Sequence, residues 1–386
     1  MASHLFVSIQ KERGHLRIYF WGKKIFSYNT DRNFFSKNFF YRKNILLNER
    51  NFQLRKGGEK ERGILFVIPS LESKGGIESR LLKYAQQLRL VGIEPYFLSQ
   101  YNEYTPILDN FTIYYLRFHD ANFKKCFFEL LKHKHFDAIE FQFGGTEYFE
   151  KLDIEALKKS HRVGGTIHGL FPLPENQLAK LDYCCLVSNS IPYNGHNKVF
   201  QLNGVIPHPV CWKFNEQRKA LFISRLDKEK LPTLKVFLDF CLEKNIIPEI
   251  AAPLSNKNAL AVRSLIKHEY GDTPSFIGAI DTLQFLKKHS QEYLFVAGVG
   301  QVPIEALSLG YPAFVCSHLG LEHSSFVSEK NFDVLRTYNF VIRRNKGEFP
   351  VSQELPDKNF HQLPAELLKK ISFLEIFAEY RKIIRL

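Results

Sequence analysis

The sequence lacks the signals of several common protein classes. Its 386 residues contain no apolar run of about 18 residues, the length that a membrane-spanning helix needs. Residues 1–13 show no apolar segment after a basic start, so we expect no signal peptide. The six cysteines form no C-x-x-C pair and no Cys/His spacing typical of a zinc site. These absences predict a cytoplasmic protein with reduced thiols.

Apolar and basic residues are abundant. Hydrophobic residues make up 45% of the chain, enough for buried cores, and the length favours two domains. Lys and Arg outnumber Asp and Glu by 53 to 40, which gives a formal net charge of +13. This charge favours an anionic partner, either nucleic acid, acidic membrane lipid, or phosphorylated glycan and nucleotide substrates. Charge alone does not choose among them.

Residues 1–62 differ from the rest because aromatic residues are interleaved with Lys and Arg, as in Phe20-Trp21-Gly-Lys-Lys24. This mixture fits an anionic membrane surface, where cations meet head groups and rings lie at the boundary. It also fits RNA, whose bases stack on aromatic rings. A strand-and-turn appendage that packs on the main body is the third interpretation. The three stay open at this point.

From Gly63 onward, short apolar strands alternate with helices. Gly63–Pro69 is predicted as a wholly apolar strand, Ile77–Leu90 as a helix and Ile93–Leu98 as the next strand. Further strands are predicted at Thr112–Leu116, Ala138–Phe141, Arg162–Ile167, Cys184–Ser188 and Val199–Leu202. Repeated β-α-β spacing predicts an α/β fold with a doubly wound parallel sheet over residues 63–208.

A linker-like stretch with two prolines precedes a second series of this kind, over residues 209–363. Its helices are predicted at Pro232–Glu243 and Pro303–Leu309, and residues 364–386 as one amphipathic helix. Its strands are predicted at Ala220–Ser224, Ile247–Ala251, Ser275–Ile277, Tyr293–Ala297 and Ala313–Cys316. Two Rossmann-like domains that face each other across a cleft fit the whole pattern.

Two segments that follow predicted strands offer groups that bind anions. Gly75 and Gly76 precede the first helix, where the backbone can approach a ligand closely and free N–H groups point at an anion. A tight turn explains these glycines equally well. Arg225 and Lys230 follow the strand Ala220–Ser224, where cations can hold a diphosphate and stabilise it as it leaves. A solvated charge run is the alternative.

Residues 294–307 are the most informative segment. Gly298, Val299 and Gly300 come at the end of a strand, and backbone N–H groups there could cradle a phosphate. Glu305, early in the next helix, could accept hydrogen bonds from ribose hydroxyls, or could simply stabilise the helix dipole. A dinucleotide-binding fingerprint needs a third glycine where this chain has a proline, so NAD binding is disfavoured.

One histidine and one missing motif complete the candidate site. His168 ends the strand Arg162–Ile167 and could face the cleft, although a lone histidine is often structural. The chain contains no Asp-x-Asp triplet, which disfavours transferases that hold their donor through a divalent metal. We therefore expect no metal and no cofactor.

In their order along the chain, these segments resemble the retaining glycosyltransferases of the bacterial GT-B family known as glycosyltransferase family four. Thr166-Ile-His168-Gly is similar to the family's Thr-x-His-Asp segment, and Asn203-Gly-Val205 to its Asn-Gly-Val. Phe222–Lys230 is similar to the Gly-Arg-Leu-x-x-x-Lys region, and Glu305–Pro312 to the Glu-Ala-x-x-x-Gly-x-Pro signature. The resemblance runs from Gly63 to the C-terminus.

The resemblance implies a role for each candidate residue. Arg225 and Lys230 would bind the diphosphate of a nucleotide-sugar donor, and Glu305 the ribose. Gly76 and the turn at 298–302 would line the phosphate channel, and His168 would face the transferred sugar. Transfer would retain the configuration of the sugar and need no metal.

The resemblance also implies an acceptor and a location. The acceptor would be a lipopolysaccharide core, a capsule precursor or a similar anionic glycan or glycolipid, with no nucleic acid as partner. Ile18–Tyr28 is similar to segments that open some lipopolysaccharide glycosyltransferases. The protein would then work in the cytoplasm or peripherally on the inner face of the bacterial inner membrane, with residues 1–62 on the anionic surface.

One position departs from the family pattern. Eight residues before the glutamate that matches Glu305, the family has a second glutamate that contacts the donor sugar, and this chain has Ala297. The change implies a different donor, a different sugar-holding group, or an inactive relative. The alternative function is therefore a glycan- or nucleotide-binding scaffold without catalysis.

Overall fold

A computed structural model describes residues 7–12, 15–20, 23–29, 46–48, 63–68, 76–99, 111–116, 123–143, 147–170, 174–206, 208–214, 216, 218–225, 228–253, 257–272, 274–343 and 350–385. Residues 1–46 and residues 47–386 form two compact units, and each is described by itself. No helix in these ranges is both long and apolar enough to cross a membrane.

The first unit contains an antiparallel sheet of three consecutive strands, β1 (Val7–Glu12), β2 (His15–Phe20) and β3 (Lys23–Asn29). The register between β2 and β3 shifts at Ile18/Tyr19, as at a β-bulge. The described residues of this unit form strands, while contact with membrane, with RNA or with the main body stays a prediction.

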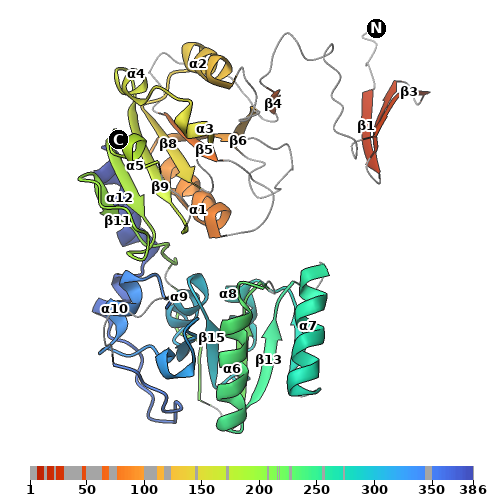
Figure 1. The fold of residues 1–386 in the computed structure, drawn as a ribbon, viewed down its shortest axis with the longest axis vertical. Coiled ribbons are helices and arrows are strands. Elements are labelled where there is room, and N and C mark those ends of the chain that lie inside the picture. Colours follow the sequence, from red (N-terminus) through yellow and green to blue (C-terminus); the bar gives the residue numbers. More distant parts are fainter. Residues whose placement is uncertain are drawn as a thin grey trace. The chain divides into compact units, whose positions relative to one another are not determined.

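The second unit begins with an eight-stranded sheet, in the order β11-β10-β9-β8-β5-β6-β7-β4 (Figure 1). The strands from β11 to β7 run parallel. The eight strands of the sheet are β4 (Leu46–Asn48), β5 (Gly63–Ile68), β6 (Glu94–Ser99), β7 (Thr112–Tyr115), β8 (Ala138–Phe143), β9 (Arg162–Ile167), β10 (Tyr183–Leu186) and β11 (Lys198–Phe200). Its helices are α1 (Gly76–Leu90), α2 (Phe123–His133), α3 (Glu147–Glu150), α4 (Ile154–Lys158) and α5 (Glu175–Leu178).

A six-stranded sheet follows, in the order β14-β13-β12-β15-β16-β17, with only the edge strand β17 antiparallel. Its strands are β12 (Lys219–Ile223), β13 (Ile247–Ala251), β14 (Ser275–Gly278), β15 (Phe295–Gly298), β16 (Ala313–Val315) and β17 (Ser325–Phe326). Its helices are α6 (Leu231–Glu243), α7 (Lys257–Tyr270), α8 (Thr282–Lys288), α9 (Gln301–Ser308) and α10 (Phe332–Thr337), with a short 3-10 turn at Leu321–His323.

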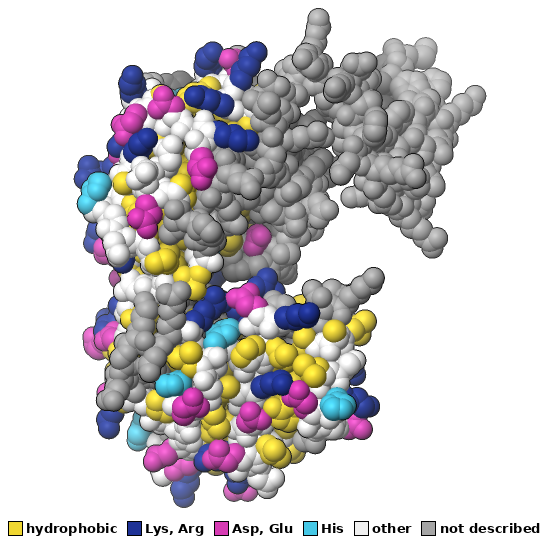
Figure 2. Space-filling view, viewed as in Figure 1, with side chains coloured by type: hydrophobic (Ala, Val, Ile, Leu, Met, Phe, Trp, Pro, Cys, Tyr) yellow, Lys and Arg dark blue, Asp and Glu magenta, His cyan; other side chains and the backbone are white. Residues whose placement is uncertain are grey.

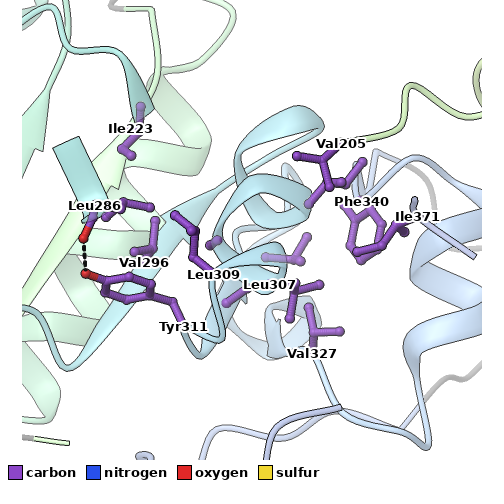
Figure 3. Close-up of a cluster of buried hydrophobic side chains, with 14 of the residues drawn as sticks. Val205, Ile223, Leu286, Val296, Leu307, Leu309, Tyr311, Val327, Phe340 and Ile371 are labelled. Carbon is purple, nitrogen blue, oxygen red and sulfur yellow. Dashed lines mark hydrogen bonds between the residues drawn. The ribbon is translucent and has the colours of Figure 1, made fainter. Parts of the chain in front are cut away.

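The central strands of both sheets are largely buried, as expected of parallel sheets that are covered on both faces. Every residue of β5 is buried, as the run Gly63–Ile68 predicts. In the six-stranded sheet, α6 and α7 pack on one face, against Phe222 and Phe295. The opposite face packs against α8 and α9 in a cluster that Figure 3 shows in close-up, where the Tyr311 hydroxyl donates to the Leu286 carbonyl at 2.8 Å. The prediction of two doubly wound parallel sheets is confirmed.

The strand order reverses once in each sheet. The chain passes from β5 outward to β6 and β7, then returns to β8 on the other side of β5. In the six-stranded sheet it passes from β12 to β13 and β14, then returns to β15. Ligands of open α/β sheets bind beyond the carboxyl ends of the strands at such reversals. The two places to search for a site are therefore the ends of β5 and β8 and the ends of β12 and β15.

The C-terminal segment differs from the prediction of a single amphipathic helix. The structure has two helices, α11 (Ala365–Lys369) and α12 (Phe373–Ile384). The break between them has a physical cause, because Ser372 forms an isolated β-bridge with Val205. The Val205 amide bonds to the Ile371 carbonyl, and the Phe373 amide to the Val205 carbonyl.

Helix α12 packs on the eight-stranded sheet (Figure 1) through residues at helical spacing: Phe373, Phe377, Tyr380 and Ile384. Rings of these residues surround Tyr84 of α1, with centroids 4.6 Å apart for Tyr84 and Tyr380. Arg162 of β9 donates two hydrogen bonds, at 3.0 and 2.7 Å, to the Ile383 carbonyl at the end of the helix.

We expect Phe377→Ala to lower the free energy of unfolding by about 3–5 kcal/mol, because it leaves a cavity among aromatic rings. Leu374→Ala is the matched control on the same helix, since the Leu374 side chain is 50% exposed and its loss should cost less than about 0.5 kcal/mol. Chemical denaturation followed by circular dichroism measures both. Equal effects would show that α12 is not held by this cluster.

Candidate functional site

The basic candidates lie at the carboxyl edge of the six-stranded sheet, at its reversal point. Arg225 comes two residues after β12 and is exposed, and Lys230 is the N-cap residue of α6. Because α6 begins at this edge, its unpaired N–H groups and Lys230 offer positive charge in the same place. The position fits the predicted role in holding a diphosphate.

The structure adds residues that the sequence did not single out. Arg343 donates to the Glu229 carboxylate at 2.6 Å. Although burial opposes it, Lys230 and Arg343 hold the pKa of Glu229 below its ordinary value. Glu229 thus tethers Arg343 beside Lys230. No local sequence signal links residues 114 positions apart.

His318 joins this group from the end of β16. Burial, and then the charges of Lys230 and Arg343, lower the pKa of His318 to about 4, so its imidazole is neutral near pH 7. A neutral imidazole can accept or donate a hydrogen bond. Its place directly after a predicted strand was a signal that sequence reasoning missed.

Glu305 lies in α9, half-buried, near the same edge. Burial raises the pKa of Glu305 above its ordinary value, and the ammonium of Lys83 and the hydroxyl of Thr282 oppose this shift. Lys83, on α1, also donates to the Gly204 carbonyl at 2.9 Å. Carboxylate, hydroxyl and ammonium together form a polar set that could bind ribose hydroxyls.

The glycine turn before α9 only partly fits the predicted phosphate cradle. Gly298 approaches its neighbours so closely that a Cβ there would lie 2.9 Å from Val302 Cγ1 and 3.1 Å from the Ile223 carbonyl. Gly300 has a φ of +67°, which favours glycine. The Gly300 amide, however, donates to the Phe340 carbonyl at 3.0 Å, so it is not available to a phosphate. The first turn of α9, which begins at Gln301 rather than at Pro303, can still offer amides.

The other candidates belong to the eight-stranded sheet. Gly76 begins α1, while Gly75 lies outside the described residues. His168 follows β9 and is half-buried, with Nε2 2.8 Å from Gln142 Oε1. Burial and then the Arg80 guanidinium hold the pKa of His168 well below its ordinary value. His168 is therefore neutral near pH 7.

On the face that Figure 2 shows, acidic and basic side chains of the described residues are mixed, with no face-wide basic patch. Across the described ranges, no group of three or more His, Cys, Asp or Glu side chains could hold a metal ion. Chemistry without a metal stays a prediction.

Solved structures with the same architecture identify the fold. The apo form of the lipopolysaccharide outer core galactosyltransferase WaaB matches with a TM-score of 0.57 and 14% identity, over 84% of this chain and 99% of that one. TarM matches with a TM-score of 0.53 and 11% identity over the same shares. The chain has the GT-B fold. Its sequence matches no protein-family model and no curated protein.

The place of Ala297 in the structure changes the interpretation that its position in the sequence suggests. Ala297 lies inside β15, fully buried, between Phe222 of β12 and Phe314 of β16. A carboxylate here would lie in an aromatic core rather than against a donor sugar. The alanine is a packing residue, and it does not favour the inactive scaffold.

We expect Ala297→Glu to destabilise the protein by more than about 4 kcal/mol or to abolish soluble expression, because it buries an unpaired charge. Ala261→Glu, on the exposed side of α7, is the matched control and should leave stability nearly unchanged. Thermal unfolding measures the stability of both variants. A stable Ala297→Glu protein would return this position to the list of sugar-binding candidates.

Proposed function

We propose that this chain is a glycosyltransferase that moves a sugar from a nucleotide-sugar donor to a cell-surface glycan precursor. The observation that carries the proposal is that Arg225 and Lys230 follow β12 and the helix of Glu305 follows β15, the two strands at the reversal point of the six-stranded sheet. The GT-B fold supports glycosyl transfer at this coarse level.

In this proposal each residue acts on a part of the donor. Arg225 and Lys230 hold the diphosphate, together with the N-terminus of α6, and stabilise its negative charge as the bond to the sugar breaks. Arg343, tethered by Glu229, adds a third cation. Glu305 accepts hydrogen bonds from the ribose, and His168 contacts the transferred sugar. With the leaving group held by fixed cations, transfer needs no metal, and the resemblance to retaining glycosyltransferases supports retention of the sugar's configuration.

The acceptor we propose is an anionic glycan or glycolipid, either a lipopolysaccharide core or a capsule precursor. The net charge of +13 supports an anionic acceptor, and the similarity in fold to a lipopolysaccharide outer core galactosyltransferase supports this class. The location we propose is the cytoplasm or the inner face of the bacterial inner membrane. Residues 1–62 would hold the protein there.

Sedimentation with lipid vesicles tests this attachment. The full chain should sediment with anionic but not with zwitterionic vesicles.

The test is nucleotide release from UDP-, GDP-, CMP- and ADP-linked sugars, with and without a crude surface-glycan extract. Wild-type protein should release nucleotide from one donor in an acceptor-dependent manner. The double variant Arg225→Ala, Lys230→Ala should lose at least about 100-fold in kcat/KM, because it removes two charge-assisted contacts to the leaving group.

Lys267→Ala is the control for loss of positive charge. Lys267 pairs with Asp272 on the exposed end of α7, away from the carboxyl edge of the sheet. Its removal should leave kcat/KM within a factor of two. Turnover retained in the double variant would sink the diphosphate role, and silence of folded wild-type protein with every donor would count against the transferase.

A further inference from the structure

Strand β8 carries two polar residues in an otherwise apolar, fully buried run, Ala138-Ile-Glu140-Phe-Gln142-Phe143. Glu140 and Gln142 are two residues apart, so their side chains point to the same face of the sheet. Glu140 is 2% exposed and Gln142 is fully buried. Buried polar groups are costly unless every one is hydrogen-bonded, so their partners need an explanation.

Four donors satisfy the Glu140 carboxylate. Oε1 accepts from Gln142 Nε2 at 2.7 Å and from Thr166 Oγ1 at 2.8 Å. Oε2 accepts from the Tyr183 hydroxyl at 2.9 Å and from the Tyr380 hydroxyl. An ionised carboxylate has about four lone-pair sites, so all of them are used. Strands β8, β9 and β10 and helix α12 together fix this group.

The carboxylate fixes the orientation of the Gln142 amide. A carboxylate only accepts hydrogen bonds, so the amide nitrogen must face Glu140, and the amide oxygen must point the other way. That oxygen lies 2.8 Å from Nε2 of His168. An amide oxygen only accepts, so Nε2 of His168 must carry the hydrogen.

The tautomer of His168 follows from this arrangement. A neutral imidazole with hydrogen on Nε2 has a lone pair on Nδ1. Burial and Arg80 keep His168 neutral by lowering its pKa. A ligand that meets Nδ1 must therefore donate a hydrogen bond to it.

We propose that Glu140 and Gln142 are positioning residues that make His168 a hydrogen-bond acceptor through Nδ1, which selects a donor sugar presenting a free hydroxyl there. The proposal rests on the proposed function in one respect, the contact between His168 and the transferred sugar. A sugar that lacks this hydroxyl, or carries fluorine in its place, leaves Nδ1 of His168 without a donor in the occupied site and should be rejected.

Nuclear magnetic resonance of the full chain labelled with ¹⁵N-histidine tests the tautomer directly. Long-range ¹H–¹⁵N correlations distinguish hydrogen on Nε2 from hydrogen on Nδ1, and His168→Gln assigns the His168 signals. We expect His168 to carry its hydrogen on Nε2. His161 is an internal control of the opposite kind, because its Nδ1 lies 2.6 Å from the Phe136 carbonyl and must carry the hydrogen. Hydrogen on Nδ1 of His168, or a charged imidazole at pH 7, would overturn the proposal.

Two variants separate positioning from general support of the core. Gln142→Leu removes the link between Glu140 and His168. The hydrogen of His168 should then no longer be fixed on Nε2, and the two tautomers should exchange. Thr166→Val is the matched control, because it also removes one donor to Glu140 but leaves Gln142 and His168 in contact. It should keep the wild-type tautomer. The wild-type spectrum decides the tautomer even if Gln142→Leu does not fold.

Kinetics with the active donor and its monodeoxy and monofluoro analogues test selectivity. Wild-type protein and Thr166→Val should prefer the parent sugar over one of these analogues by at least about 100-fold in kcat/KM. Gln142→Leu should reduce this preference to about 10-fold or less. Unchanged selectivity in Gln142→Leu would overturn the proposal. If the protein turns over a donor but His168 carries its hydrogen on Nδ1, this inference alone is overturned. If His168 carries its hydrogen on Nε2 but no donor is turned over, the sugar contact is overturned together with the proposed function.

Discussion

Parallel strands bring their carboxyl ends to one edge of a sheet, and this constraint places nearly every candidate residue of this chain. Arg225 follows β12, Glu305 lies in the helix after β15, and His318 follows β16. In the other sheet His168 follows β9. Within each sheet, residues far apart in the sequence thus lie at one edge, because each follows a strand and the parallel strands end at the same edge.

The second constraint is electrostatic. Burial, and then Lys230 and Arg343, lower the pKa of His318, and the same two cations lower the pKa of Glu229 against the effect of burial. If a diphosphate binds here as proposed, it meets positive charges that are already held in place. The tether of Arg343 to Glu229 reduces the entropy that a long side chain would lose on binding.

Buried polar groups link the eight-stranded sheet to the end of the chain. The Tyr380 hydroxyl of α12 bonds to Glu140, whose other partners come from β8, β9 and β10. The C-terminal helix therefore completes a polar network as well as an apolar core. This network ends at His168, which places a candidate site residue at one end of a chain of hydrogen bonds and the C-terminal helix at the other.

Much of the fold could be predicted from local pattern. Gly63–Pro69 was predicted as a strand from its apolar run and Ile247–Ala251 from its place in the second β-α-β series, and the structure has strands at Gly63–Ile68 and Ile247–Ala251. The C-terminal segment could not be predicted in detail, because the break before α12 depends on pairing with Val205.

The site divides in the same way. The places of the candidate residues after strands could be predicted, but their hydrogen-bond partners could not. The Gly300 amide donates to the Phe340 carbonyl, and Gln142 contacts His168, and the partners in both pairs are far apart in the sequence. The meaning of Ala297 depended on which face of β15 it occupies.

Hydrogen–deuterium exchange of the full chain, with and without a saturating nucleoside diphosphate, tests where the nucleotide binds. If the nucleotide binds at the carboxyl edge of the six-stranded sheet, exchange should slow in residues 224–231 and 298–305 and stay unchanged in α7. Protection confined to the eight-stranded sheet, or no protection although calorimetry records binding, would contradict the account.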